Sequence, residues 1–248
     1  MTEIRFSANL GLLWRDLPFI ERMQAAGANG FKAVEFHDHA QREDLAEVKS
    51  ALDAHNLELV SLNVKMSGCF GKAAIPGSQN LAQADILEAV NAADVLGAEA
   101  IHVLSGCTQE SSALEVFVDN LAFALENTDK TILIEPIANI PGYFLNSLSF
   151  AVDIIERISN PQLKIMFDCF HVRHKHQDLI AEFNGIRNLI GHVQIASYPN
   201  RNEPIDGKIC YSRLIPEMID AGYEGRFGCE YFSTSSVEDG LGWMKQFR

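Results

Sequence analysis

The sequence predicts one α/β domain, residues 1–248, in which eight parallel strands, each followed by a helix, close into a (β/α)8 barrel. Short apolar runs alternate along the chain with longer segments whose apolar residues recur at three- and four-residue steps. Eight such units in about 250 residues match the usual size of this barrel. The chain has no GxGxxG or GxxxxGKS/T loop, which disfavours a doubly wound sheet, and no linker that indicates a second domain.

Eight apolar runs are the predicted strands. In chain order they are Arg5–Asn9, Ala33–Phe36, Val60–Asn63, Ala100–Leu104, Ile132–Glu135, Leu163–Asp168, His192–Ala196 and Phe227–Glu230. Between them, segments such as 17–23 and 45–52 place their apolar residues on one helix face, which would pack on the strands. Gly27 and Gly97 close two of these helical patterns, as expected for a left-handed residue just past a helix end.

Charge and cysteine usage limit the classes of partner. A formal net charge of −13 argues against nucleic acid, because phosphate binding depends mainly on surplus Lys and Arg. No apolar run is long enough to predict a signal peptide or a membrane span. The five cysteines are scattered without a CxxC pair, which predicts reduced thiols and a cytoplasmic protein rather than a disulfide framework.

Four polar side chains end consecutive predicted strands in the second half of the chain. They are Glu135, Asp168, Gln194 and Glu230. Active sites of such barrels form at the carboxyl ends of the strands, where the longest loop-like interval, Met66–Asn80, also falls. Burying three carboxylates together is costly unless a cation compensates them. Carboxylate and amide oxygens favour a hard divalent ion such as Mg²⁺ or Mn²⁺; the alternative is that each acid is separately salt-bridged or caps the next helix.

Short motifs along nearly the whole chain carry a family resemblance. They are Phe6–Leu10, Leu17–Glu21, Ala33–Phe36, Glu135–Pro136, Pro141–Leu145, Asp168 with His171, Gly191–Ala196, Arg201–Pro204 and Gly228–Tyr231. The chain thereby resembles hydroxypyruvate isomerases, which belong to the xylose isomerase-like TIM barrels. The resemblance implies one divalent metal ion held by Glu135, Asp168, Gln194 and Glu230, and makes a homodimer or tetramer plausible. It also implies that Glu135 and Glu230 are the catalytic proton-transfer pair, and that His171 and Arg201 bind substrate oxygens.

The implied reaction is an aldose–ketose type isomerisation of a small hydroxy-keto acid. A proton leaves the carbon beside a carbonyl and returns to the neighbouring carbon, through an enediolate that a metal would stabilise. His171, whose ordinary titration lies near neutral pH, is expected to move the second proton. Arg201 is expected to grip the substrate carboxylate, with Lys65 or Lys72 as helpers, unless it is simply a solvated loop residue.

Two departures from the family pattern leave the substrate open. The run after the arginine reads Glu203–Lys208 with a lysine in place of an acid, and Asn63–Lys72 differs from the usual loop. Hydroxypyruvate and tartronate semialdehyde are the leading pair, and a 2-oxo-tetronate fits the same groups. Glu203 is expected either to orient Arg201 or to be a surface acid.

Three alternatives remain at this point. A ketose 3-epimerase would use the same metal and glutamates. An endonuclease IV-like nuclease would share His102 with the acids, but Gln194 stands where that family would have another histidine. A non-catalytic sugar-acid binding protein would not need both Glu135 and Glu230.

The remaining histidines carry weaker expectations. His37 and His39 follow the second strand and would either face the pocket mouth or serve as a cap or surface residue. We expect His174 and His176 to be solvated, and His55 and His192 to be structural.

Overall fold

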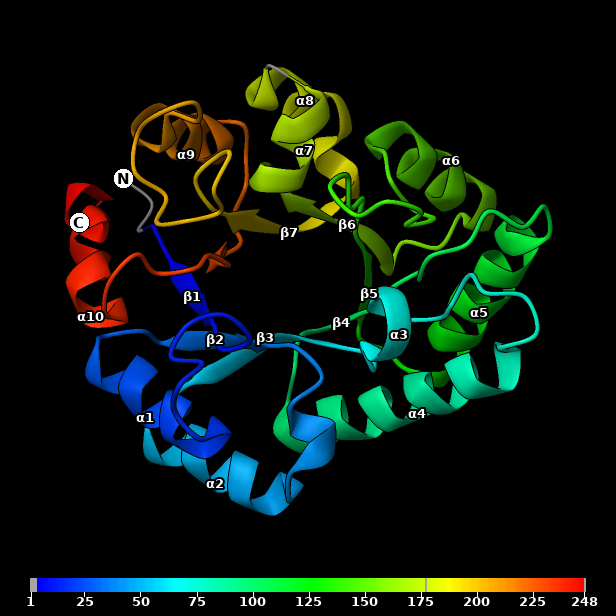
Figure 1. Ribbon diagram of the computed structural model, residues 1–248, viewed down its shortest axis with the longest axis horizontal. Coiled ribbons are helices and arrows are strands. Elements are labelled where there is room, and N and C mark those ends of the chain that lie inside the picture. The colour runs from blue at the N-terminus through cyan, green and yellow to red at the C-terminus, as the bar shows by residue number, and fades with distance from the viewer. Residues whose placement is uncertain (1–3, 177, 248) are drawn as a thin grey trace.

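Eight parallel strands close into a barrel in chain order, as predicted (Figure 1). This computed structural model describes residues 4–176 and 178–247. The strands are β1 (Phe6–Asn9), β2 (Ala33–Phe36), β3 (Glu58–Asn63), β4 (Ala100–His102), β5 (Thr131–Ile134), β6 (Leu163–Asp168), β7 (Ile190–Ile195) and β8 (Phe227–Cys229). Every predicted strand is found; Ala33–Phe36 and Leu163–Asp168 match at both ends, and the ends of the others differ by at most two residues. The (β/α)8 barrel is therefore confirmed.

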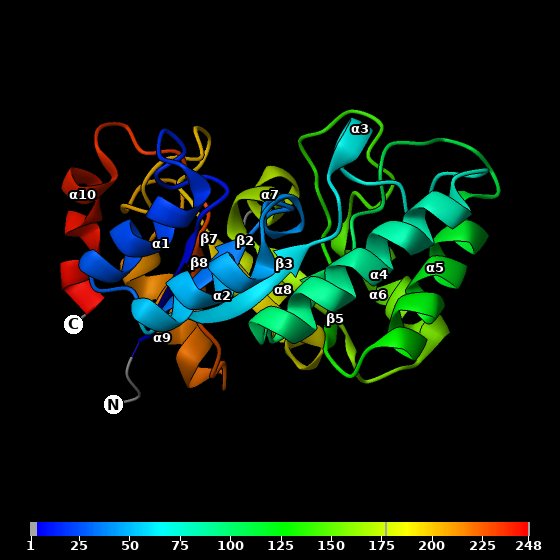
Figure 2. The ribbon, with the colours of Figure 1, turned by 90° about the horizontal axis from the view of Figure 1, so that it is seen from below.

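Helices surround the strands on the outside of the ring, except α3 (Ser67–Phe70), which lies among the loops at one end of the barrel (Figures 1 and 2). In chain order the helices are α1 (Phe19–Ala28), α2 (Leu45–Ala54), α3 (Ser67–Phe70), α4 (Gln79–Leu96), α5 (Ala113–Asn127), α6 (Leu148–Ile158), α7 (Cys169–Lys175), α8 (Leu179–Ile186), α9 (Tyr211–Asp220) and α10 (Val237–Gly240). Three 3-10 segments are η1 (Ala40–Arg42), η2 (Arg187–Leu189) and η3 (Leu241–Phe247). The helical period places Phe19 and Met23 of α1 in the core, as predicted for segment 17–23, and Ala26 extends the same buried face.

The two glycine caps behave differently. Gly97 follows α4 in the left-handed conformation with φ 76°, as predicted. The prediction for Gly27 is wrong, because α1 continues to Ala28 and the positive φ falls on Gly30. A Cβ on Gly27 would lie 3.0 Å from His55 Cβ, so this glycine instead allows α1 to approach the end of α2 closely.

The inside of the barrel changes character along its axis. Because side chains alternate along a strand, Leu133 faces the same side as Glu135, and Met166 the same side as Asp168. Ala100, Leu133 and Met166 form a separate apolar cluster of buried residues. The carboxyl end of each of these strands is polar, with His102, Glu135 and Asp168, and this polar layer faces the loops.

The loops that follow the strands lie together at one edge of the molecule (the upper edge in Figure 2). There the structure corrects the expectation of five reduced thiols, because Cys69 in α3 forms a disulfide with Cys107 after β4, with a Cα–Cα distance of 5.5 Å. The two cysteines are 38 residues apart in sequence, but loops after adjacent strands meet at the same edge. Cys169, Cys210 and Cys229 are free.

The helices give no sign of a membrane span. Within residues 4–176 and 178–247, none is both long enough and apolar enough to cross a bilayer.

Candidate active site

A cavity of about 560 Å³ occupies the carboxyl end of the barrel. Its polar lining comes from the strand ends and the loops beyond them: His37, Asn63, His102, Glu135, Asn139, His171, Gln194, Asn200, Arg15, Arg201 and Glu230. Apolar side chains, among them Phe70, Phe170 and Phe232, form much of the remaining wall. Six of the eight strands therefore deliver a polar group to one enclosed space, as expected for the catalytic end of this barrel.

The four predicted metal ligands stand where their strands end. Asp168 is the last residue of β6, Gln194 lies in β7 directly opposite it in register, and Glu135 and Glu230 come one residue after β5 and β8. One oxygen of Glu135, one of Asp168 and a ring nitrogen of His171 all lie within 4.8 Å of one another. The structure therefore adds His171 to the groups that can share a metal ion.

Two buried oxygens of this group lack hydrogen-bond partners. They are Glu135 Oε1 and Gln194 Oε1, in side chains that are 5% and 3% exposed. A buried polar atom without a partner costs about 1–3 kcal/mol, so such atoms indicate a group that is satisfied by something else. Carboxylate and amide oxygens are ligands of hard divalent cations. The residues present therefore fit a divalent metal ion.

Asp168 performs two tasks at once. Its Oδ1 accepts a hydrogen bond from the backbone N–H of Phe170 at 2.7 Å and so caps α7, as one alternative anticipated. Its Oδ2 faces the site, 3.6 Å from His171 Nε2 and 2.9 Å from Arg201 Nη2. Capping and membership of the site are therefore not exclusive.

Arg201 is partly buried among acids, with its side chain 18% exposed, and is not a solvated loop residue. Its Nη2 donates to Asp168 Oδ2 at 2.9 Å and to Glu230 Oε2 at 2.8 Å. The guanidinium lies over the Phe170 ring, 5.1 Å from its centre. One positive charge therefore compensates two buried carboxylates. Among the hydrogen bonds of the described chain none uses Arg201 Nη1, which leaves that group for a ligand.

The two glutamates differ in proton affinity. Burial, with the negative charges of Glu230 and Asp168, raises the pKa of Glu135 well above its ordinary value. Burial would also raise the pKa of Glu230, but the charge of Arg201 and the hydrogen bond with His37 outweigh it and lower the pKa to about 2. Glu135 therefore has the higher proton affinity and Glu230 the lower, an arrangement suited to moving a proton across a ligand.

His171 differs from its expected titration. Burial, followed by the charge of Arg201, lowers its pKa well below the ordinary value, so its imidazole is neutral at pH 7. The ordinary titration of a histidine near neutral pH is shifted here because the side chain is only 2% exposed. A neutral imidazole can still donate or accept one hydrogen bond.

Two histidines that received weaker expectations lie in the cavity wall. His37 Nε2 is 3.0 Å from Glu230 Oε1, and a Cβ on Gly11 would come within 2.3 Å of its ring, so that glycine makes room for it. His102 pairs through Nδ1 with Asn63 Oδ1 at 3.2 Å and points Nε2 at Glu135 Oε2, 3.8 Å away. Both residues stand at strand ends, His37 just after β2 and His102 at the end of β4, like the predicted ligands of the later strands.

The other histidines lie outside the cavity lining. His39 stacks on Phe19 with ring centres 5.0 Å apart, and His174 contacts Tyr198. His176 pairs with Glu182 at 2.8 Å. His192 is buried and bonded to Glu35, in line with a structural role.

The expected helpers of Arg201 are engaged elsewhere. Lys72 pairs with Asp85 at 2.5 Å and Lys65 lies 3.7 Å from Glu88, and neither lines the cavity. Glu203 does neither of the two things expected of it, because its buried carboxylate accepts hydrogen bonds from Thr234.

Arg15 also lines the cavity and was not among the residues predicted there. It is exposed and lies over the Phe232 ring, 5.3 Å from the ring centre. It stands in a loop with no strand-end signal that would have marked it.

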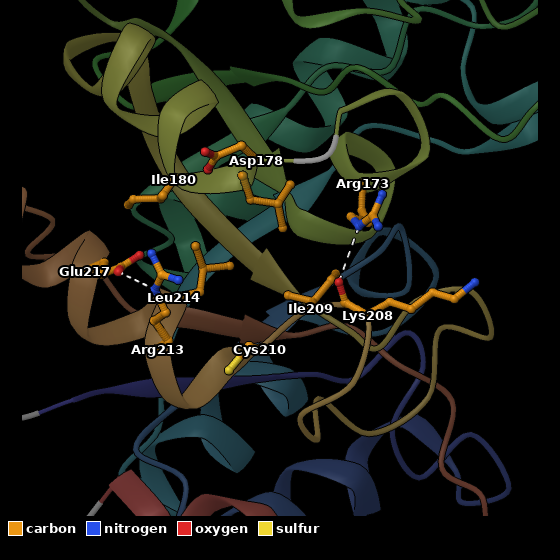
Figure 3. A pocket seen from close by; sticks show the side chains of 10 residues that line it. Arg173, Asp178, Ile180, Lys208, Ile209, Cys210, Arg213, Leu214 and Glu217 are labelled. Atoms are coloured by element: carbon orange, nitrogen blue, oxygen red, sulfur yellow. Dashed lines mark hydrogen bonds and ion pairs between the residues drawn. The ribbon is translucent and has the colours of Figure 1, made fainter.

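A second cavity, of about 340 Å³, lies at the side of the barrel between α7, α8 and α9 (Figure 3). Its two arginines already have partners: Arg213 Nε bonds to Glu217 at 2.6 Å, and Arg173 Nε donates to the Lys208 carbonyl at 3.4 Å. None of the strand-end residues lines it. Of these two cavities, the one at the carboxyl end of the barrel, called the barrel mouth below, holds the strand-end polar residues.

Comparison with known proteins gives consistent matches. Residues 23–247 match the family described as xylose isomerase-like TIM barrel. The chain is 35% identical to 2-oxo-tetronate isomerase of Cupriavidus necator, covering 98% of each chain, and 33% identical to hydroxypyruvate isomerase of Escherichia coli, covering 99% of this chain and 100% of that one. A crystal structure described as AP endonuclease, family 2, from Brucella melitensis superimposes with a TM-score of 0.95 at 32% identity over the full length of both chains.

Proposed function

We propose, since this chain belongs to the xylose isomerase-like TIM barrel family and within it to the hydroxypyruvate and 2-oxo-tetronate isomerases, that its barrel mouth isomerises a small hydroxy-keto acid. The chain is an isomerase of the hydroxypyruvate isomerase kind. The substrate pair we favour is hydroxypyruvate and tartronate semialdehyde, and a 2-oxo-tetronate is the second choice. The observation that carries the proposal is the group of strand-end residues at the carboxyl end of the barrel. Glu135, Gln194 and Glu230 line one cavity, and an oxygen of Asp168 lies within 4.8 Å of Glu135 and His171. Glu135 Oε1 and Gln194 Oε1 are buried without hydrogen-bond partners.

Proton transfer is assigned to the two glutamates. Glu230, ionised beside Arg201 and His37, is suited to remove a proton from the carbon next to the substrate carbonyl. Glu135, whose pKa is raised by burial and by its acidic neighbours, is suited to hold a proton and return it to the adjacent carbon. His171, as a neutral imidazole between Glu135 and Asp168, is suited to pass the proton between the two substrate oxygens.

A divalent ion, Mg²⁺ or Mn²⁺, would be held by Glu135, Asp168, Gln194 and Glu230, with His171 beside them. When bound, it supplies positive charge for the oxygens of the enediolate. The apolar wall of Phe70, Phe170 and Phe232 limits the access of water to those oxygens.

Recognition of an acid is assigned to the two arginines of the cavity. Arg201 has Nη1 free of hydrogen bonds within the described chain, and Arg15 stands at the rim of the same cavity. A carboxylate between them would meet two cations, whereas a neutral ketose would gain nothing from either charge. This favours the isomerase of an acid over a ketose 3-epimerase.

The test is an isomerisation screen. The protein is stripped with a chelator and assayed with hydroxypyruvate, 2-oxo-tetronates and neutral ketoses, with and without added Mn²⁺ or Mg²⁺. We expect turnover of an acid that depends on the added ion. Turnover of neutral ketoses alone would replace the isomerase of an acid with the epimerase, and activity without the ion would contradict the metal site.

Neither a nuclease nor a binding protein is favoured by these residues. Gln194 lies where a nuclease of this fold would need another histidine, and the net charge of −13 opposes binding of a polyanion. A binding protein would not need two glutamates with opposite shifts in pKa.

We also propose a cytoplasmic location, with Cys69 and Cys107 as the chain's one paired set of cysteines, and a homo-oligomer, which follows the family resemblance. Cell fractionation followed by thiol labelling would report both the compartment and the redox state of Cys69 and Cys107 there. Light scattering would report the oligomeric state.

A further inference from the structure

Glu35 is a buried carboxylate inside the barrel that the proposed isomerisation does not use. It lies in β2, is 1% exposed, and its oxygens accept hydrogen bonds from two other strands. Ser7 Oγ of β1 donates at 2.5 Å and His192 Nε2 of β7 lies at 3.0 Å, both on Oε1, while Gln194 Nε2 of β7 donates to Oε2 at 2.8 Å. One side chain thus connects β2 with the far side of the ring.

The barrel makes room for this carboxylate at one position in particular. A Cβ on Gly228 of β8 would lie 2.2 Å from Glu35 Oε1, a distance that no side chain can occupy. Gly228 pairs in register with Ser7 on one side and with Gln194 on the other. The glycine therefore lets Glu35 extend between its neighbours.

The contact with Gln194 fixes which end of the carboxamide faces the cavity. A carboxamide has a donor end and an acceptor end. Because its donor, Nε2, is bonded to Glu35, its acceptor, Oε1, points the other way, where it is buried without a partner next to the register position of Asp168. The opposite orientation would place an NH2 group against the carboxylates of the site and bring two acceptors together at Glu35.

We propose that Glu35 is the positioning residue that holds Gln194 Oε1 towards the metal site. The metal part of this inference rests on the proposed function, since Gln194 is a ligand only if a cation binds between the strand-end acids. Ser7 and His192 hold Glu35 in turn, so the orientation of the ligand is set by a chain of hydrogen bonds from three strands.

The first test measures Mn²⁺ affinity by electron paramagnetic resonance of the free ion, which needs no turnover. We expect Glu35→Gln to weaken Mn²⁺ binding about 10–100-fold, the usual effect of losing the partner of a metal ligand. In a Gln194→Ala background the same substitution should weaken binding no further. Unchanged affinity in Glu35→Gln, or an equal loss in both backgrounds, would overturn the proposal.

The matched control is Glu203→Gln, the same substitution at another buried glutamate, whose partner is Thr234. It should leave Mn²⁺ affinity within about twofold of wild type, since it contacts no ligand. A loss as large as that in Glu35→Gln would show that any buried glutamate of this barrel has the same effect, which would overturn a specific role of Glu35.

The second test needs no metal and no substitution of Glu35. In the NMR spectrum of metal-free wild type, the Gln194 side-chain NH2, assigned from its absence in Gln194→Ala, should exchange with water far more slowly than that of exposed Gln24 or Gln109. Exchange as fast as in those residues would overturn the positioning. If wild type bound no Mn²⁺ while this NH2 stayed protected, the metal site of the proposed function would fail and the positioning of the carboxamide would stand.

Discussion

Each end of the barrel holds an arginine between two acids, but in different surroundings. At the amino end, Arg226 bonds to Glu58 and, at 3.1 Å, to Glu99, two acids that are 63% and 57% exposed. At the carboxyl end, Arg201 bonds to Asp168 and Glu230, which are 1% and 10% exposed. The acids are thus solvated at one end and buried at the other, whereas the two arginine side chains are similarly covered, at 14% and 18% exposed.

The difference separates a structural contact from a site. Exposed ion pairs contribute little, typically up to about 1 kcal/mol, and water can replace either partner. Buried carboxylates are costly, and at the mouth the cost is increased by unpartnered oxygens on Glu135 and Gln194. An arrangement that stability alone would not favour is expected where a ligand completes it.

We expect the largest effect from replacing the two glutamates at the carboxyl end of the barrel. Glu230→Gln or Glu135→Gln should lower the exchange of solvent deuterium into the substrate carbon by about 10²–10⁴-fold, because each removes one proton-transfer group. Exchange is followed by NMR with Mn²⁺ occupancy measured in parallel, since each glutamate is also a proposed ligand. Full exchange in both variants would refute their role.

We expect the next largest effect from removing the Arg201 guanidinium. Arg201→Met should weaken the binding of a hydroxy-keto acid by about 2–5 kcal/mol, the usual cost of truncating one partner of a buried charge pair. The binding of a neutral ketose should change little. Arg15→Met, at the exposed rim of the same cavity, is the matched comparison and should cost less. Equal losses for charged and neutral substrates in Arg201→Met would show that Arg201 holds the acids and not the substrate.

The disulfide gives the mouth a covalent tie. Replacement of both Cys69 and Cys107 by Ser should lower the free energy of unfolding by about 2–4 kcal/mol, because the closed loop restricts the unfolded chain. Denaturant unfolding under oxidising conditions measures it, and the double variant should no longer respond to reductant. A wild type that is equally stable with and without reductant would contradict the contribution of this disulfide.

A pH effect is expected at His39, beside the mouth. Burial, with the charges of His37 and Arg22, lowers its pKa to about 4, below the ordinary 6.5. Between pH 6.5 and 4 the unfolded chain therefore binds a proton at His39 that the folded chain does not bind. The contribution of His39 to the free energy of unfolding is complete above pH 6.5 and is lost as the pH falls towards 4. Since the side chain is only half-buried, we expect the loss to be about 1–2 kcal/mol. Unfolding of His39→Gln between pH 7.5 and 4.5 should show a correspondingly flatter loss, and a slope equal to that of wild type would contradict it.

The smallest effect is expected at the amino end. Arg226→Met should change the free energy of unfolding by about 1 kcal/mol or less, because its partners Glu58 and Glu99 remain solvated when it is lost. The kcat/KM value should equal that of wild type. A loss of activity comparable to that of Arg201→Met would remove the distinction between the two ends.

Much of the site follows from local sequence patterns. Apolar runs that end in Glu135, Asp168, Gln194 and Glu230 predict both the strands and the polar group that each delivers, because parallel strands of a barrel end at one edge. His37 and His102 obey the same rule. Their position in the wall was not established from sequence, since a histidine beyond a strand can equally be a cap or a surface residue.

Other features had only weak local signals. Glu35 interrupts an apolar strand, but nothing near it in sequence indicates Gln194, which is 159 residues away. Gly27 resembled a helix cap, whereas the approach of His55 decides its role. Lys65 and Lys72 were expected at the substrate, and the acids of α4 hold them instead.

The apolar runs and the helical period predict the order of strands and helices, the closed barrel and the polar residues at the strand ends, because these patterns depend on near neighbours in the chain. Which residues meet depends on the tertiary structure: Arg201 lies between Asp168 and Glu230, Cys69 reaches Cys107, and Glu35 turns the Gln194 carboxamide. These contacts join strands and loops that become adjacent only when the ring closes, so their geometry is set by packing across the barrel and not by any local pattern.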